Sequence, residues 1–176
     1  MRKLLILAAP LALLASPALA QSSTGTVDIS GSVAGRCLFT LPNQTISLGE
    51  LALGGTGATA GKLDVSKVNG KTATLIGWCN NTAATMTVTT TELINPATAA
   101  TGFDKRVDYT ATAVANAASA SDTSLTAGAG SAGTVGMFTG NVVVTLSAAS
   151  SPTSGLLVAG AYTGNVVVTL TPTVAP

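Results

Sequence analysis

Two segments near the end of the chain repeat almost the same nine residues in an alternating pattern. Residues 138–146 read Phe-Thr-Gly-Asn-Val-Val-Val-Thr-Leu, and residues 162–170 differ only by Tyr in place of Phe. In the second copy, one face would carry Tyr162, Gly164, Val166, Val168 and Leu170. A period of two is that of a β-strand, whose successive side chains point to opposite faces. We therefore expect two similar strands of one sandwich, because two copies are too few for a repeat architecture.

Other parts of the chain have the same strand-like character. Five further short segments combine Thr with larger apolar residues: 26–33, 37–41, 45–51, 71–79 and 85–91. Thr and Val favour the pleated sheet, and only 9% of the residues have the charged side chains that usually cover helices. Counting the alternating segments gives roughly seven or eight short strands, which is the pattern of an all-β sandwich.

One stretch, residues 111–136, has no clear period. It consists mainly of Ala, Ser, Gly and Thr. Residues 113–120 are compatible with a short helix. The glycines at 128, 130 and 133 indicate a loop or a weak strand for the remainder.

The first twenty residues have the three parts of a secretion signal. Arg2 and Lys3 precede an apolar run over residues 4–15, and the small residues Ala18 and Ala20 follow it. The run is too short to cross about 30 Å of hydrocarbon as a helix. We therefore expect cleavage after Ala20 and no transmembrane anchor.

Two cysteines remain in the exported chain, Cys37 and Cys79. In an oxidising compartment an even number of cysteines indicates disulfides, and two cysteines allow one pairing. A metal site is disfavoured, because zinc takes about four ligands and the chain has no histidine. We expect a disulfide that stabilises the domain by roughly 4 kcal/mol.

The chain offers little catalytic chemistry. Without histidine it lacks the usual general base and the usual partner of a nucleophilic Ser or Cys. Its acidic residues are scattered, and the closest cluster, Asp104 and Asp108 around Lys105 and Arg106, is expected to be a solvated loop or surface strand. Six basic and seven acidic residues follow the signal, which does not favour nucleic acid. We expect no enzyme, cofactor or metal.

The segment just before the first cysteine also alternates. Val27, Ile29 and Val33 fall on one face of an expected strand over residues 26–33, and Gly31 leaves a gap in that row. A glycine inside a strand often marks the close approach of another backbone.

The order of these features resembles subunits of chaperone–usher pili, including the spore-coat-U-like pilins of the archaic branch. The resemblance rests on the signal peptide, the alternating segment before Cys37, the second cysteine within Trp78-Cys79-Asn80-Asn81-Thr82, and the final strand introduced by residues 157–162. In that family the subunit is an immunoglobulin-like sandwich that lacks its last strand. A periplasmic chaperone fills the resulting groove first. The N-terminal strand of the next subunit then replaces the chaperone at the outer-membrane usher.

This resemblance implies a division into a signal peptide (1–20), an N-terminal donor-strand extension (21–35) and a pilin β-sandwich domain (36–176). The implied donor residues are Val27, Ile29, Gly31 and Val33. The implied groove-edge residues are Tyr162, Gly164, Val166, Val168 and Leu170. The expected partners are identical or related pilin subunits, in a homopolymer that is secreted through the periplasm and forms a pilus on the cell surface. Adhesion or biofilm formation would be its role.

Two alternatives remain at this point. Residues 26–33 would pair within their own chain in a self-complete secreted sandwich that binds a ligand, or the chain would be a minor or tip adhesin subunit. The chain also ends Thr171-Pro172-Thr173-Val174-Ala175-Pro176, without the terminal aromatic that many such pilins present to the chaperone. The receptor and the filament geometry are not encoded in any recognisable motif.

Overall fold

The computed structural model describes residues 21–128 and 130–173. The expected signal peptide therefore lies outside the described residues. The chain divides into two units, the first ending at Val33 and the second starting at Ala34. Each is described by itself.

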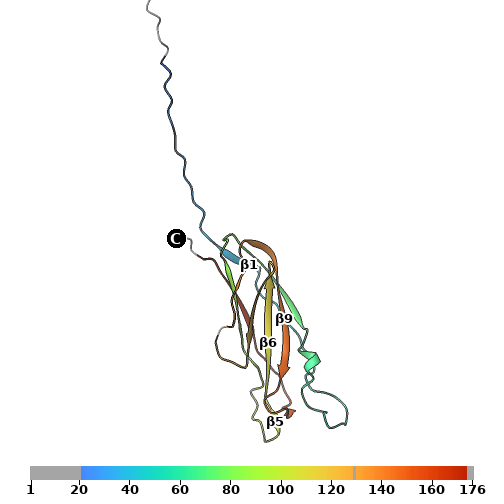
Figure 1. Cartoon of the computed structure of the whole chain (residues 1–176). Helices are drawn as coiled ribbons and strands as arrows, with labels where there is room; N and C mark the ends of the chain where they lie inside the picture. Colours follow the sequence, from blue (N-terminus) through green and yellow to red (C-terminus); the bar gives the residue numbers. More distant parts are fainter. Residues whose placement is uncertain (1–20, 129, 174–176) are drawn as a thin grey trace, which may run out of the picture. The chain divides into compact units, whose positions relative to one another are not determined.

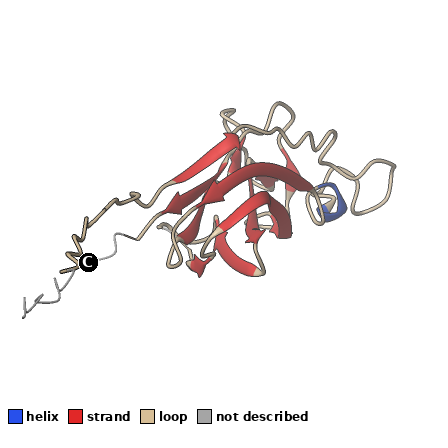
Figure 2. Ribbon diagram, turned by 90° about the horizontal axis from the view of Figure 1, so that it is seen from above, coloured by secondary structure: helices blue, strands red, loops and turns tan. Residues whose placement is uncertain are grey.

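The regular secondary structure of the second unit is almost all β-strand, and long loops join the strands (Figures 1 and 2). In chain order they are β1 (Cys37–Leu41), β2 (Thr72–Cys79), β3 (Thr85–Thr90), β4 (Leu93–Ile94), β5 (Phe103–Asp104), β6 (Arg106–Ala115), β7 (Ala118–Thr123), β8 (Gly133–Thr134), β9 (Phe138–Ser150), β10 (Leu156–Leu157) and β11 (Val166–Thr171). A short 3-10 turn, η1 (Val65–Lys67), lies between β1 and β2 in the chain and is blue in Figure 2. The expectation of an all-β fold is confirmed.

Most strands form two antiparallel sheets that enclose one core, and β5 and β10 form a separate two-stranded parallel sheet. In the larger sheet the order is β1-β2-β9-β6-β4, with β7 also paired to β6, and in the smaller sheet it is β11-β3-β8. The fully buried side chains of Met86 and Val88 on β3 belong to the same apolar cluster as Val142 and Val144 on β9. The domain is therefore a sandwich, as expected.

The expected disulfide is present between Cys37 and Cys79. These residues face each other across the antiparallel pair of β1 and β2. The bond ties the first strand of the domain to a strand of the larger sheet.

The expected short helix over residues 113–120 is wrong. This part of the chain is a hairpin in which β6 and β7 pair with Ala113 opposite Ala120. Asn116 and Ala117 form the turn, with φ angles of 47° and 63°. Ala favours helices in isolation, but here the alternate alanines are buried against the core, and tertiary burial outweighs a weak local preference.

The cluster of charged residues at 104–108 was expected to be solvated, but the side chains of Asp104 and Asp108 are buried. Asp108 accepts a hydrogen bond from Nε of Arg106 at 3.1 Å. Asp104 accepts from the hydroxyl and N–H of Thr153 and from the N–H of Gly155. Burial opposes ionisation of Asp104, but these donors outweigh it and lower the pKa of the carboxyl group.

The expected strands at 26–33 and 45–51 are not strands in the structure. In the first unit, Val27, Ile29 and Val33 are 84%, 93% and 88% exposed. A strand needs a neighbouring strand to satisfy its backbone N–H and C=O groups. Neither segment is part of a ladder, although both have the right alternation.

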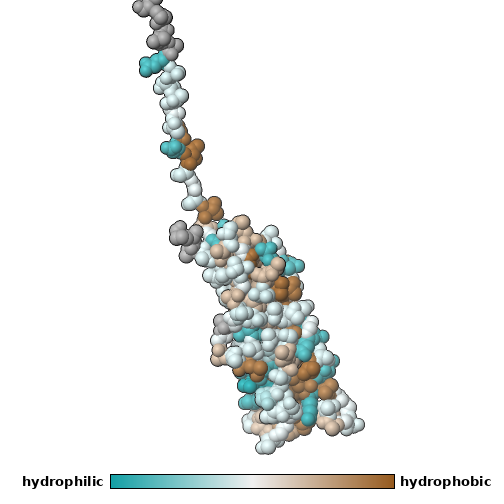
Figure 3. Space-filling model, viewed as in Figure 1, coloured by the Kyte–Doolittle hydropathy of each residue, from teal (hydrophilic) through white to brown (hydrophobic). Residues whose placement is uncertain are grey.

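The surface of the domain carries few charges. Figure 3 shows mostly pale, neutral residues on the face in view, with separate brown and teal patches. This agrees with the low content of charged residues in the whole chain.

Candidate functional site

Two adjoining cavities form what we call the groove, the first beside β11 and the second beside residues 157–164, which precede β11. Their volumes are about 490 and 710 Å³. They share the lining residues Thr45, Ile46, Leu48, Leu93 and Gly164. β11 provides one wall of the first cavity, and residues of the 42–48 segment provide another. β2 and β9 contribute core side chains to its lining.

β11 has an open edge, because it pairs with β3 on one side and ends the smaller sheet. Just before β11, the carbonyl of Asn165 accepts a hydrogen bond from the N–H of Thr91 at 2.9 Å. In an antiparallel pair, hydrogen-bonded and non-hydrogen-bonded residues alternate. Val166, Val168 and Leu170 therefore direct their backbone N–H and C=O groups away from β3, to the open edge.

The two copies of the repeated segment show how the open edge of β11 affects the burial of its side chains. In β9, which lies between β2 and β6, Val142, Val144 and Leu146 are only 0%, 5% and 5% exposed.

The same residue types stand at the equivalent positions of β11. There, Val166, Val168 and Leu170 point to the core but are only partly buried. Because the residues are the same, the difference comes from the surroundings. The second copy lacks the cover that a neighbouring element gives the first.

The wall opposite β11 is also without a backbone partner. Residues 43–50 make no backbone–backbone hydrogen bond with any residue that the structure describes. Ile46 and Leu48 nevertheless turn their side chains to the core and pack against it. This segment is therefore an extended wall of the groove, with apolar side chains turned inward and a backbone free to pair.

One buried tyrosine, Tyr109, lies beside this groove. The hydroxyl of Tyr109 donates to the carbonyl of Asn165 at 3.1 Å, just before β11. Desolvation, together with the nearby carboxylates of Glu92 and Asp122, raises the pKa of Tyr109 to about 12. Tyr109 is therefore a neutral hydrogen-bond donor at the groove at any physiological pH.

The expected groove-edge residues fall into two groups in the structure, those on β11 and those in the segment before it. Val166, Val168 and Leu170 lie on β11, whereas Tyr162 and Gly164 precede it. The hydroxyl of Tyr162 lies 2.9 Å from the carbonyl of Asp104 and 3.0 Å from that of Val158, and burial raises its pKa.

Gly164 is required by close approach. A Cβ at this position would lie 2.6 Å from the carbonyl oxygen of Glu92, which is too close for any other residue. The sequence pattern placed Gly164 on the right face but did not reveal this contact.

Several groove residues were not expected from the sequence. Ile46 and Leu48 were expected only as part of a strand over residues 45–51, and Phe39, Leu75 and Tyr109 were not assigned to any site. The alternation of residues 45–51 was the available signal. It was interpreted as a paired strand, whereas the structure leaves it as an unpaired wall.

Comparisons with known proteins identify no relative. No family model, no curated protein and no solved structure matches this chain. In the described part of the chain, no helix has the length and apolar character needed to cross a membrane. Over the same residues, no cluster of three or more side chains suited to holding a metal ion occurs.

Proposed function

We propose that the chain is a structural subunit of an extracellular filament, in which residues 26–33 of one copy fill the groove of the next copy. The observation that carries this proposal is the contrast between β9 and β11. The same residues are fully covered in one strand and partly uncovered in the other, and β11 has an open edge. The groove therefore has the character of a site for one further strand.

The N-terminal segment has the chemistry that such a site would take. Its apolar residues Val27, Ile29 and Val33 alternate with polar ones and are exposed. Among the residues that the structure describes, none that lines the first cavity is charged. An added strand would turn Asp28 to the opposite face, away from the apolar lining. Strand addition gains affinity from main-chain hydrogen bonds and specificity from alternate side chains.

Polymerisation is expected because the donor segment and the groove belong to different units of the chain. The donor residues belong to the first unit, and the groove belongs to the second. A head-to-tail contact that does not close on itself generates an open filament. By the family resemblance, a periplasmic chaperone and an outer-membrane usher would assemble this filament at the cell surface, where it would support adhesion or biofilm formation.

The test compares three forms of the exported chain: residues 21–176, residues 34–176, and residues 34–176 with a copy of residues 24–35 joined after Pro176 by a short Gly-Ser linker. We expect the first form to make oligomers of increasing size in light scattering. The second should be the least stable, and the third should be a monomer with a melting temperature raised by more than about 10 °C, because it fills its own groove.

The matched control carries the same appended segment with Val27, Ile29 and Val33 changed to Thr. These changes keep the length and the backbone but remove apolar side chains, so the increase in melting temperature should be largely lost. Equal stability of residues 34–176 with and without the appended copy would contradict the proposal. That result would favour a self-complete secreted sandwich whose groove binds another ligand.

A further inference from the structure

The residues that connect the proposed donor segment to the domain are held by one side chain. Oδ1 of Asn80 accepts a hydrogen bond from the N–H of Arg36 at 2.5 Å, and Nδ2 of Asn80 donates to the carbonyl of Ala34 at 3.0 Å. The backbone N–H of Asn80 also donates to the carbonyl of Arg36 at 3.0 Å. One residue thus makes three hydrogen bonds to residues 34–36, which we call the connector.

The neighbouring residue, Asn81, holds the other end of the domain at the same place. Its Nδ2 donates to the carbonyl of Thr173 at 2.5 Å, and its Oδ1 accepts from the N–H of Ala83 at 2.9 Å. Gly35 fits between Asn81 and Pro172, since a Cβ on Gly35 would lie 3.0 Å from Nδ2 of Asn81 and 3.6 Å from Cβ of Pro172. The connector is therefore packed as well as hydrogen-bonded.

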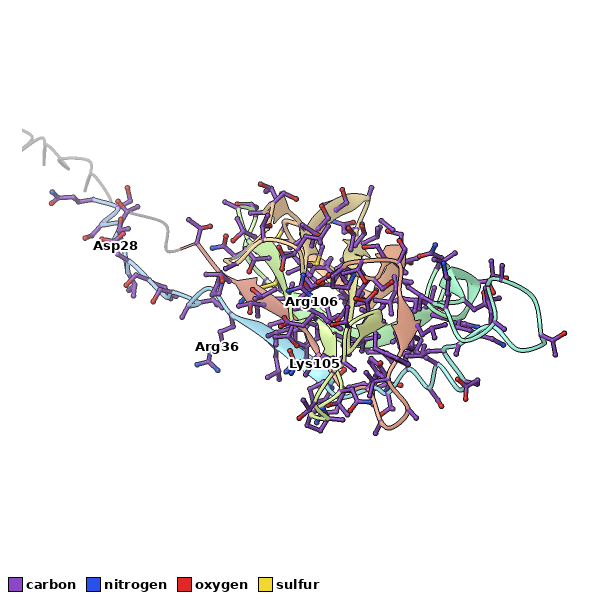
Figure 4. The ribbon with its side chains drawn as sticks, turned by 90° about the horizontal axis from the view of Figure 1, so that it is seen from below. Asp28, Arg36, Lys105 and Arg106 are labelled. Carbon is purple, nitrogen blue, oxygen red and sulfur yellow. A yellow bond between two sulfur atoms is a disulfide. The ribbon has the colours of Figure 1, made fainter. Side chains whose placement is uncertain are left out.

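The connector is short. It spans only the residues between Val33, the last expected donor residue, and Cys37, where β1 and the disulfide begin. The side chain of Arg36 projects away from the sheets (Figure 4), so this residue takes part in these hydrogen bonds through its backbone alone. Three residues of this kind leave few free dihedral angles between donor and domain.

We propose that Asn80 is a positioning residue that sets the angle between successive subunits and makes each joint of the filament stiff. This inference rests on the proposed function, because it needs the donor segment to lie in a neighbouring copy. A free connector would let each subunit swing on the next. A connector that is hydrogen-bonded to Asn80 would instead fix the orientation of each domain relative to the donor segment that it inserts into the next copy.

The test uses filaments of the full exported chain that carry Asn80→Ala. Electron microscopy measures the persistence length of the filaments, and hydrogen exchange with mass spectrometry follows a peptide that spans residues 34–41. We expect filaments to form in the normal yield, with a persistence length reduced at least about twofold and amide exchange in the connector about three to ten times faster, because the hydrogen bonds of the side chain are lost.

Two further variants serve as controls. Asn141→Ala removes an exposed amide on β9 and should leave both measurements unchanged. Inserting Gly-Ser between Val33 and Ala34 leaves every contact of Asn80 intact but adds free length, and it should soften the filaments as much as Asn80→Ala does.

Filaments of unchanged stiffness in Asn80→Ala would overturn the inference, whether or not the insertion variant is softer, and would leave the proposed function standing. A lack of filaments from the unaltered chain would overturn both.

Discussion

A valine in this fold is stabilising only to the extent that its surroundings cover it. Val144 on β9 and Val168 on β11 occupy the same place in the two copies of the repeat, yet only Val144 is almost fully buried. The chain therefore contains its own internal control for the effect of a missing neighbour. Comparing the two valines removes any difference in side-chain chemistry.

We expect Val144→Ala to lower the free energy of unfolding by about 2 kcal/mol, since it deletes two buried methyl groups. In residues 34–176 alone, Val168→Ala should cost less than about 1 kcal/mol, because its side chain is already partly in water. In the form with the appended donor copy, the cost of Val168→Ala should approach that of Val144→Ala. Urea unfolding measures these three costs, and an equal cost of Val168→Ala in the two forms would argue against a filled groove.

The hydroxyl of Tyr109 predicts how stability depends on alkaline pH. Its pKa is raised from about 10 to about 12 in the folded chain, so folding favours the protonated form. This contribution to stability is complete below about pH 10 and is lost as the pH rises towards 12. Urea unfolding between pH 8 and 11.5 should show the decline. The decline should be smaller in Tyr109→Phe, and an equal decline would assign it to other groups.

At the scale of elements, the strands that the sequence predicted are those with a local period. The segments at 37–41, 71–79 and 85–91 are β1, β2 and β3 in the structure, within one residue at each end. The signals were local ones: alternation in residues 85–91, and the turn residues Pro42 and Asn43 directly after residues 37–41. Alternation alone was not sufficient, since residues 26–33 and 45–51 also alternate and are not strands.

What the sequence did not predict depends on distant partners. The hairpin of β6 and β7 was missed because its buried positions over residues 111–120 are alanines, which carry no strand signal. Asp104 was expected in solvent because its donors, Thr153 and Gly155, lie about fifty residues further along the chain. In the groove, the faces of β11 followed from its period, but the wall at residues 43–50 did not.

The turn between β6 and β7 predicts a stabilising substitution. Ala117 has a φ of 63°, in the left-handed region where a Cβ costs roughly 1 kcal/mol. We expect Ala117→Gly to raise the free energy of unfolding by about 0.5 kcal/mol, since relief of this strain exceeds the added freedom of the unfolded chain. Ala115→Gly, at a buried position of β6, should be destabilising instead. Thermal melts of both variants check the prediction, which fails if Ala117→Gly melts lower than the parent.

The unpaired wall of the groove predicts a change in amide protection. Residues 43–50 have no backbone partner among the described residues, so their amides should exchange quickly in residues 34–176. With the donor copy appended, part of this wall and the open edge of β11 should become protected by at least about tenfold. Protection of β11 alone would mean that the added strand pairs with one wall only.

At the scale of the whole molecule, the low charge predicts how the proposed filament would respond to salt. No charged residue of the described part of the chain lines the first cavity of the groove, and the donor residues named above are apolar or glycine. Salt screens ion pairs but does not weaken apolar contacts. Filaments assembled in dilute buffer should therefore remain intact in 1 M NaCl, as measured by sedimentation. Dissociation in salt would point to an ionic interface that these contacts do not provide.

The asparagine pair after β2 also has a practical consequence. Asn81 holds Thr173 beside the connector, so the end of β11 and the beginning of β1 are bound to the same short turn. A peptide tag or enzyme fused beyond Thr173 would then emerge at the place where one subunit is linked to the next. In the proposed filament such cargo would be displayed once per joint, at a regular spacing set by the length of a single domain.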